Sequence, residues 1–253
     1  MFRPLFIFCG FYLTLLLFGV VGLALSLLAL LAGVLPPSDG LERWFQRRIH
    51  NCFEFYLWWV TLSGVMRVHY HGLTRLPRDG RGLLIAANHP GLPDITWLLA
   101  CVSETICIFK PAIRRNPVLG AAARRAGYLA SDGGHEVVRL AAEKLAAGHK
   151  LVVFPEGTRS PPGAPLLPFK PGFVLMAQRG CVPIQLVRIE YSRPILAKGQ
   201  ALWKFPALPA DVDITVGPLL AVPPDAHPAT LTAEIEAWFR APHLAVSSPT
   251  IFS

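Results

Sequence analysis

The chain has 253 residues, of which 53% are hydrophobic and only 16% are charged, and its formal net charge is +8. Such an apolar composition is unusual for a soluble protein, and the length allows one catalytic domain plus a membrane segment. No nucleic-acid module and no long lysine or arginine run is present, so we expect anionic lipid as a partner rather than nucleic acid. The 5 cysteines are odd in number and form no C-x-x-C pair, which argues against a disulfide framework or a zinc site.

The first 38 residues are predicted to form an N-terminal membrane helix, because positions 4–38 contain no charged residue. A secretory signal peptide is the alternative, since Arg3 supplies a positive n-region. The apolar stretch is too long for such a peptide, and no clear cleavage site precedes Pro36. It also exceeds the roughly 20 residues that span a bilayer. Either a long tilted span or a helix bent near Gly19 or Gly22 fits.

Residues 39–64 are predicted to form an amphipathic helix at the membrane interface. Arg43, Arg47 and Arg48 precede an aromatic cluster at 53–60, and this combination suits the level of the lipid headgroups. A core helix with a basic exposed face is the alternative. By the positive-inside rule the arginines place this side in the cytoplasm. We therefore expect a membrane protein whose active site lies on the cytoplasmic face of the membrane. In a bacterium this membrane is the inner membrane.

Residues 65–241 alternate apolar runs with helical stretches, which predicts an α/β fold with a mostly parallel central sheet flanked by helices. The expected strands are 65–70, 83–87, 105–109, 151–154, 182–189 and 212–216. The expected helices are 95–101, 116–126, 136–147, 172–179 and 230–240. Residues 161–165 are expected to form a mobile rim, and residues 242–253 a flexible tail.

His89 and Asp94 lie in the loop that leaves the buried strand 83–87, a position where catalytic groups often gather. An imidazole at this place can accept a proton, and a carboxylate beside it can fix the tautomer and stabilise the imidazolium. No G-x-S-x-G elbow is present, so the sequence offers no serine nucleophile of the hydrolase type. The alternative is structural: His89 satisfies a turn and Asp94 caps the helix that follows.

A second polar segment, Glu156 to Arg159, follows the strand 151–154. The planar guanidinium of Arg159 suits a phosphate, and Gly157 lets the backbone approach a ligand closely. Glu156 is expected to hydrogen-bond an acceptor hydroxyl or to orient Arg159, and Thr158 adds a hydroxyl. The alternative is an ion pair between Glu156 and Arg159 that closes a tight turn. Lys110, with Arg114 and Arg115, is either a further positive contact for substrate or part of a solvated basic face.

His-x4-Asp followed by Phe-Pro-Glu-Gly-Thr-Arg-Ser resembles the glycerolipid acyltransferases, over about residues 65–220. The resemblance implies transfer of a fatty acyl group from acyl-CoA or acyl carrier protein to a hydroxyl of a lyso-phospholipid or glycerol phosphate. It further implies that residues 65–241 form the catalytic domain, that His89 and Asp94 act as the general base, and that Glu156, Gly157, Thr158, Arg159 and Lys110 bind substrate. No metal and no cofactor is expected.

Two departures from the family pattern weaken lysophosphatidate as the acceptor. The block that usually ends in a basic residue reads Ser131-Asp132-Gly133-Gly134, and Leu186 stands where a second proline is usual. A lyso-aminolipid or a specialised, pigment-type lipid acceptor is the first alternative. A thioester hydrolase and a non-catalytic lipid-binding membrane protein are alternatives of other classes. The sequence gives no oligomeric state.

Overall fold

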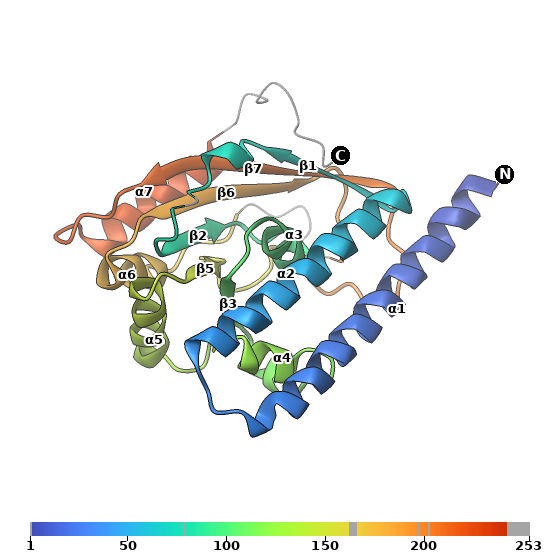
Figure 1. Ribbon diagram of the computed structural model, residues 1–253. Helices are drawn as coiled ribbons and strands as arrows, with labels where there is room; N and C mark the ends of the chain where they lie inside the picture. Colours follow the sequence, from blue (N-terminus) through green and yellow to red (C-terminus); the bar gives the residue numbers. More distant parts are fainter. Residues whose placement is uncertain (1, 78, 162–165, 197, 202, 242–253) are drawn as a thin grey trace. The chain divides into compact units, whose positions relative to one another are not determined.

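The structure is a computed structural model that describes residues 2–241 except 78, 162–165, 197 and 202 (Figure 1). The expected tail at 242–253 and nearly all of the expected rim at 161–165 lie outside the described residues. The chain divides into two compact units. Unit 1 comprises Met1–Val65 and Ile95–Val137, and unit 2 comprises Met66–Asp94 and Val138–Ser253.

Two long helices of unit 1 run side by side in opposite directions, α1 (Phe2–Leu31) and α2 (Asp39–Leu62) (Figure 1). The short 3₁₀ turn η1 (Ala32–Val34) joins them. Both stretches are therefore helical, as predicted, and α1 continues without interruption through the two glycines at which a bend was considered. Helix α2 begins where it does because the Ser38 hydroxyl accepts a hydrogen bond from the backbone N–H of Leu41 (3.3 Å).

Polar and aromatic contacts hold α1 against α2. The indole N–H of Trp59 donates a hydrogen bond to the Thr14 hydroxyl over 3.1 Å. Further along, the ring of Phe18 lies 6.3 Å from the ring of Phe53 and 5.8 Å from the ring of Tyr56, between centroids. The connection between the helices is also satisfied internally, since the Arg125 guanidinium donates to the carbonyl oxygens of Ala32 and of Leu35, the latter at 2.7 Å.

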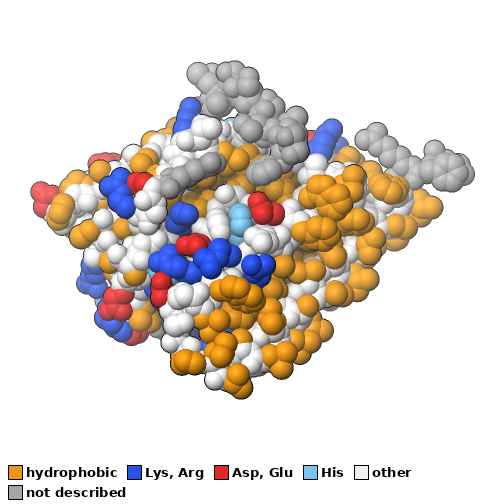
Figure 2. Space-filling model, in the orientation of Figure 1, with side chains coloured by type: hydrophobic (Ala, Val, Ile, Leu, Met, Phe, Trp, Pro, Cys, Tyr) orange, Lys and Arg blue, Asp and Glu red, His pale blue; other side chains and the backbone are white. Residues whose placement is uncertain are grey.

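Among the described residues, one helical stretch is long and apolar enough to cross a membrane, by length and composition alone. It covers Pro4–Val34 and has a mean hydropathy of 2.7. Its large apolar side chains include Leu16 and Leu27, which are 62% and 53% exposed. Figure 2 shows hydrophobic side chains gathered along the right-hand edge, where Figure 1 labels α1. One face of α1 is therefore apolar and open.

The other face of α1 packs inside unit 1. The Ser26 hydroxyl donates to the carbonyl oxygen of Val118 over 2.8 Å, and a Cβ built on Gly22 would lie 2.5 Å from a methyl carbon of Val118. The absence of a side chain at Gly22 thus allows the close approach. Ala29 of α1 joins a buried cluster that includes Phe45, Ile49, Leu99, Ala122 and Ala126.

The remaining elements of unit 1 are short. They are α3 (Asp94–Cys101), which starts at the boundary between the units, β3 (Thr105–Phe109), η3 (Pro111–Arg115), α4 (Gly120–Arg125) and β4 (Leu129–Ala130). The prediction of a helix from 116 was wrong by one turn. The Asn116 side chain accepts hydrogen bonds from the backbone N–H groups of Val118 (2.8 Å) and Leu119 (3.1 Å), which holds a turn before the helix begins.

The strands of unit 2 follow the order β1-β7-β6-β2-β5. Neighbouring strands are parallel except β6 and β7, which are antiparallel, so the predicted mostly parallel α/β architecture is confirmed. The strands are β1 (Met66–His71), β2 (Leu83–Ala87), β5 (Lys150–Val153), β6 (Ile184–Tyr191) and β7 (Ala210–Leu220). The other elements are η2 (Leu73–Arg75), α5 (His135–Ala146), α6 (Gly172–Gly180) and α7 (Pro228–Arg240). Helix α5 starts in unit 1 and continues into unit 2, and α6 packs against β2 and α7.

Three neighbouring parallel strands of this sheet, β6, β2 and β5, share one carboxyl edge. Every residue of β2 is buried, and β2 pairs with β5 on one side and with β6 on the other. Because the three strands point the same way, the residues that follow β5, β2 and β6 emerge together. This edge receives both polar motifs.

The packing of α1 gives a matched pair of substitutions. Alanine in place of glycine favours a helix by about 0.5–1 kcal/mol, so Gly19→Ala, whose Cβ would meet nothing within 4 Å, should raise the free energy of unfolding. Gly22→Ala should lower it by about 1–3 kcal/mol, because the new methyl group overlaps Val118. Thermal unfolding of both variants in detergent checks this. Equal stabilisation would mean that α1 does not pack against Val118.

Candidate active site

His89 and Asp94 are joined by a direct hydrogen bond between Nδ1 and Oδ2, 2.8 Å long. The Asp94 side chain is completely buried, whereas that of His89 remains 17% exposed. The Phe154 ring stacks on the imidazole with 4.0 Å between centroids and 14° between planes. The imidazole is thus fixed in its plane and in its direction, with one edge held by a buried carboxylate.

Three donors satisfy the buried Asp94 carboxylate. Oδ2 accepts from the backbone N–H of Gly91 (2.9 Å) in addition to His89, and Oδ1 accepts from the hydroxyl of Tyr191 (2.6 Å). Burial raises the pKa of Asp94, while the hydrogen bonds from His89, Tyr191 and Gly91 act in the opposite direction. The carboxylate is therefore buried but well supplied with donors, as a charged group in a protein interior must be.

Glu156 of the second motif holds the loop that carries His89. Its Oε1 accepts from the backbone N–H of His89 (2.9 Å), and its Oε2 accepts from the hydroxyl of Ser160 and from the backbone N–H of Leu167 (3.1 Å). The backbone N–H of Ser160 in turn donates to the carbonyl oxygen of His89 (2.9 Å). The two motifs thus form one hydrogen-bonded assembly, with Glu156 only 3% exposed.

The rest of the second motif forms a tight turn beside this assembly. The N–H of Gly157 donates to the carbonyl oxygen of Phe154, and the φ of +69° at Gly157 favours glycine. A Cβ at this position would lie 3.1 Å from Nζ of Lys170. Arg159 donates from Nη1 to the carbonyl oxygen of Leu196 over 2.7 Å and is half-buried, as is Thr158.

Asn88 and Tyr191 belong to this site and were missed by the sequence analysis. The side-chain amide of Asn88 donates to the carbonyl oxygen of Ile189 (2.8 Å) and accepts from the N–H of the same residue (2.7 Å). It thereby extends the pairing of β2 with β6 into the loop. Tyr191 ends β6 and lies two residues beyond the predicted end of that strand. The only sequence signal for Asn88 was its place directly before His89.

Comparison with known proteins decides the family. The family model described as Acyltransferase matches residues 67–190. Over 197 residues the chain is 31% identical to a lyso-ornithine lipid O-acyltransferase of Pseudomonas aeruginosa, a match that covers 73% of this chain and 70% of that protein. The chain belongs to the glycerolipid acyltransferase family.

Two further relatives are consistent with this family. A 1-acyl-sn-glycerol-3-phosphate acyltransferase of Helicobacter pylori is 34% identical over 131 residues, which cover 47% of this chain and 55% of that protein. The match thus spans about half the length of this curated relative. The crystal structure of PlsC, the 1-acyl-sn-glycerophosphate acyltransferase of Thermotoga maritima, has the same fold, with a TM-score of 0.70, 23% identity and 94% of each chain covered.

The predicted site residues do not all belong to the same unit. His89, Asp94, Glu156, Gly157, Thr158 and Arg159 all belong to unit 2, and contacts join the two motifs there. Lys110 belongs to unit 1, where it is exposed and immediately precedes η3. Arg114 pairs with Asp132 at 3.8 Å, and both side chains are about half exposed.

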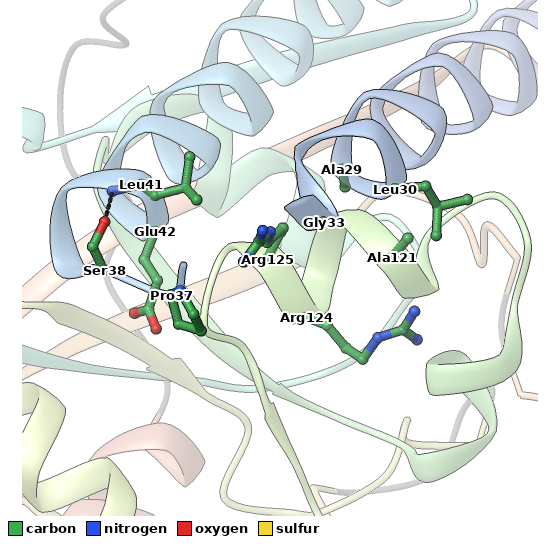
Figure 3. A pocket seen from close by; sticks show the side chains of 10 residues that line it. All are labelled: Ala29, Leu30, Gly33, Pro37, Ser38, Leu41, Glu42, Ala121, Arg124 and Arg125. Carbon is green, nitrogen blue, oxygen red and sulfur yellow. Dashed lines mark hydrogen bonds between the residues drawn. The ribbon is translucent and has the colours of Figure 1, made fainter. Parts of the chain in front are cut away.

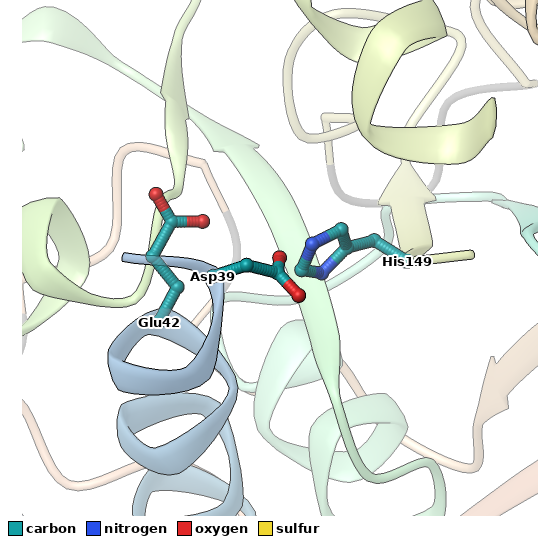
Figure 4. A group of neighbouring side chains, drawn as sticks. All are labelled: Asp39, Glu42 and His149. Atoms are coloured by element: carbon teal, nitrogen blue, oxygen red, sulfur yellow. The ribbon is translucent and has the colours of Figure 1, made fainter. Parts of the chain in front are cut away.

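Two other groups of residues do not include any residue of the two motifs. A cavity of about 360 Å³ in unit 1 is lined by side chains from the end of α1, the start of α2 and α4, including Arg124 and Arg125 (Figure 3). Figure 4 draws Asp39 and Glu42 on the first turn of α2 and His149 beside β5. Asp39 accepts a hydrogen bond from Arg43 (2.7 Å), and His149 belongs to the other unit, so we assign these three no joint role.

The buried carboxylate of Glu156 gives a prediction about stability. In Glu156→Gln an amide N–H₂ group faces backbone and hydroxyl donors, so the free energy of unfolding should fall by about 1–3 kcal/mol. Glu234→Gln, on an exposed position of α7, is the matched control and should change it by less than about 0.5 kcal/mol. Chemical denaturation measures both. An unchanged stability of Glu156→Gln would show that Glu156 does not hold the two loops together.

Proposed function

We propose that this protein transfers a fatty acyl group from a thioester donor to the hydroxyl of a lyso-lipid, with His89 as the general base. The observation that carries the proposal is the 2.8 Å hydrogen bond between His89 Nδ1 and the fully buried Asp94. A buried carboxylate in this place fixes the tautomer of an imidazole that remains partly exposed. Membership of the acyltransferase family supports the type of reaction.

The proposed reaction needs no nucleophile from the protein. Because Nδ1 of His89 faces Asp94, Nε2 is the nitrogen that takes the proton from the acceptor hydroxyl. The acceptor oxygen attacks the thioester carbonyl, the new C–O bond forms, and the C–S bond breaks. The imidazolium, stabilised by Asp94, returns its proton to the departing thiolate. The products are an ester and a free thiol, and the histidine is restored.

The second motif is proposed to bind the acceptor. Arg159 presents a planar fork of donors that fits a phosphate, and the turn at Gly157 and Thr158 exposes backbone to a ligand. Glu156 contributes by fixing the His89 loop, since its carboxylate accepts hydrogen bonds from that loop and its neighbours. Lys110 is proposed to add positive charge for a phosphate of donor or acceptor.

Two acceptor classes are supported. The name of the Helicobacter pylori relative points to 1-acyl-sn-glycerol-3-phosphate, and the names of the relatives from Pseudomonas aeruginosa, Rhizobium meliloti and Brucella abortus point to lyso-ornithine lipid. The glycines at 133 and 134, where the family usually has a basic residue, favour the acceptor without a phosphate. Acyl-CoA or acyl carrier protein is the proposed donor. Mass spectrometry of the products from a panel of lyso-lipids with each donor decides among these pairs.

Replacing the proposed base should abolish transfer without unfolding the protein. We expect His89→Ala to lower the rate of ester formation by about 10²- to 10⁴-fold, because general base catalysis contributes that much. His135→Ala, on an exposed residue at the start of α5, is the control and should keep the full rate. Product formation is measured by mass spectrometry, together with the thermal unfolding of both variants. Near-normal turnover by His89→Ala excludes the assignment.

The same assay separates the competing classes. A thioester hydrolase releases thiol without added lipid, whereas a transferase releases it only when an acceptor is present. A non-catalytic lipid-binding protein releases none with any member of the panel. Release that depends on the acceptor, and that His89→Ala abolishes, supports transfer alone.

We further propose that α1 embeds in a membrane, that α2 lies at its interface, and that the active site faces the cytoplasm. The exposed apolar face of α1 and the exposed aromatic residues Phe55 and Trp58 of α2 support this arrangement. Arg47 and Arg48, both exposed on α2, suit contact with anionic headgroups.

Charges on the open face of α1 should therefore detach the protein from lipid. The double variant Leu16→Glu, Leu27→Glu should lose most of its binding to vesicles of anionic phospholipid in a flotation assay, because burying each charge in hydrocarbon costs about 2–3 kcal/mol. The control adds the same two charges at exposed helical positions of unit 2, as Ala146→Glu and Ala233→Glu, and should float normally. Equal flotation of the two double variants would exclude α1 as the anchor.

A further inference from the structure

Tyr191 reaches the catalytic carboxylate from a third segment of the chain. It is the last residue of β6, the strand that runs parallel to β2 and pairs with it up to Ala87 and Val187. The Tyr191 hydroxyl donates a hydrogen bond of 2.6 Å to Oδ1 of Asp94, while His89 and Gly91 occupy Oδ2. The two oxygens of one buried carboxylate are thus divided between a phenol and an imidazole.

The loop beside Tyr191 is shaped to admit its phenol group. A Cβ built on Gly91 would lie 3.1 Å from both Cζ and the hydroxyl oxygen of Tyr191, and 3.1 Å from the carbonyl oxygen of Ile195. Any side chain at position 91 would therefore press on the end of the tyrosine ring. Gly91 itself is buried and donates its N–H to Asp94. The absence of a side chain and the phenol group thus belong to one arrangement around Asp94.

We propose that Tyr191 is a positioning residue of the active site, which holds Asp94 so that Oδ2 faces His89 and sets how strongly the His89–Asp94 pair retains a proton. This inference rests on the proposed function. Without the phenol, Oδ1 would lose the donor that the structure gives it, and a buried acceptor without a partner is costly. Asp94 would then turn or shift, and the geometry of the imidazole would loosen with it.

The hydrogen bond from Tyr191 to Asp94 predicts in which direction the pH profile of the reaction moves when the hydroxyl is removed. A hydroxyl that donates to a carboxylate stabilises the ionised form of that carboxylate. Removing the hydroxyl makes the carboxylate more basic, so the His89–Asp94 pair keeps its proton to a higher pH. The acidic limb of kcat/KM reports the base of the free enzyme, so this limb moves to higher pH.

The test compares Tyr191→Phe with the wild-type protein in the acyl transfer assay. We expect kcat to fall about tenfold or more, as for the loss of a hydrogen bond to a charged group, with little change in the KM for donor and acceptor. The acidic limb of kcat/KM should shift upward. A residue that serves only the stability of the fold would change neither the shape of the pH profile nor kcat in preference to KM.

Tyr128→Phe is the matched control. The Tyr128 hydroxyl is buried, and among the described residues it has no hydrogen-bond partner. Its removal deletes the same atom from a partly buried ring without touching Asp94, so kcat and the pH profile should stay unchanged. A similar loss of kcat in both phenylalanine variants would overturn the inference, because the effect would then follow from the loss of any buried hydroxyl.

Gly91→Ala provides a second route to the same hydrogen bond. The added methyl group would push the phenol by a few tenths of an ångström from its place beside Asp94, so this variant should lower kcat and shift the acidic limb in the same directions as Tyr191→Phe. Since both changes act on one hydrogen bond, the double variant Gly91→Ala, Tyr191→Phe should lose less than the product of the two single effects. Fully multiplicative effects would show that Gly91 and Tyr191 act independently.

The outcomes for the base and for Tyr191 are distinguishable. Retained transfer in His89→Ala removes the proposed function and this inference with it. Transfer that His89→Ala abolishes but Tyr191→Phe leaves at the wild-type rate and pH profile removes the inference alone. If Tyr191→Phe is poorly folded, Gly91→Ala with its pH profile decides, and an unshifted acidic limb in that variant overturns the inference.

Discussion

The arrangement of the loops around His89 depends on the hydrogen bonds to one carboxylate that is excluded from water, that of Asp94. Asp94 is completely excluded from solvent, and ionised groups are stable there only when donors surround them. The donors come from a histidine, a backbone N–H and a phenol. These donors lie at or near the ends of neighbouring strands of unit 2, so their positions around Asp94 depend on the register in which these strands pair.

A parallel arrangement makes this convergence possible. The ends of β5, β2 and β6 lie side by side, so Glu156 and His89, which follow β5 and β2, and Tyr191, the last residue of β6, meet at one edge of the sheet. Each loop is then fixed to the next by hydrogen bonds, as the Asn88 side chain fixes the end of β2 to Ile189. The imidazole is held from several directions, and such a fixed geometry is what the proposed role of His89 as a general base requires.

The sequence predicted local features well and long-range ones poorly. The strands 83–87 and 105–109 were predicted with their exact bounds, because short apolar runs between turn residues are a local signal. The pair of His89 and Asp94 was also recognisable, since its members stand close together in the chain. Tyr191 lies 97 residues from Asp94, and their contact depends on which strand pairs with β2. No periodicity in one sequence carries that information. The late start of α4 depends on a single asparagine side chain that competes with the helix for backbone N–H groups.

An arginine side chain, that of Arg125, caps the turn between α1 and α2. Arg125 supplies donors to the carbonyl oxygens of Ala32 and Leu35, at the end of the most apolar helix of the chain. In a medium poor in water, each unpaired carbonyl costs several kcal/mol. Here the guanidinium of Arg125 takes the place of water as the hydrogen-bond donor to both carbonyl oxygens. The backbone hydrogen bonding at these two carbonyls therefore does not depend on water.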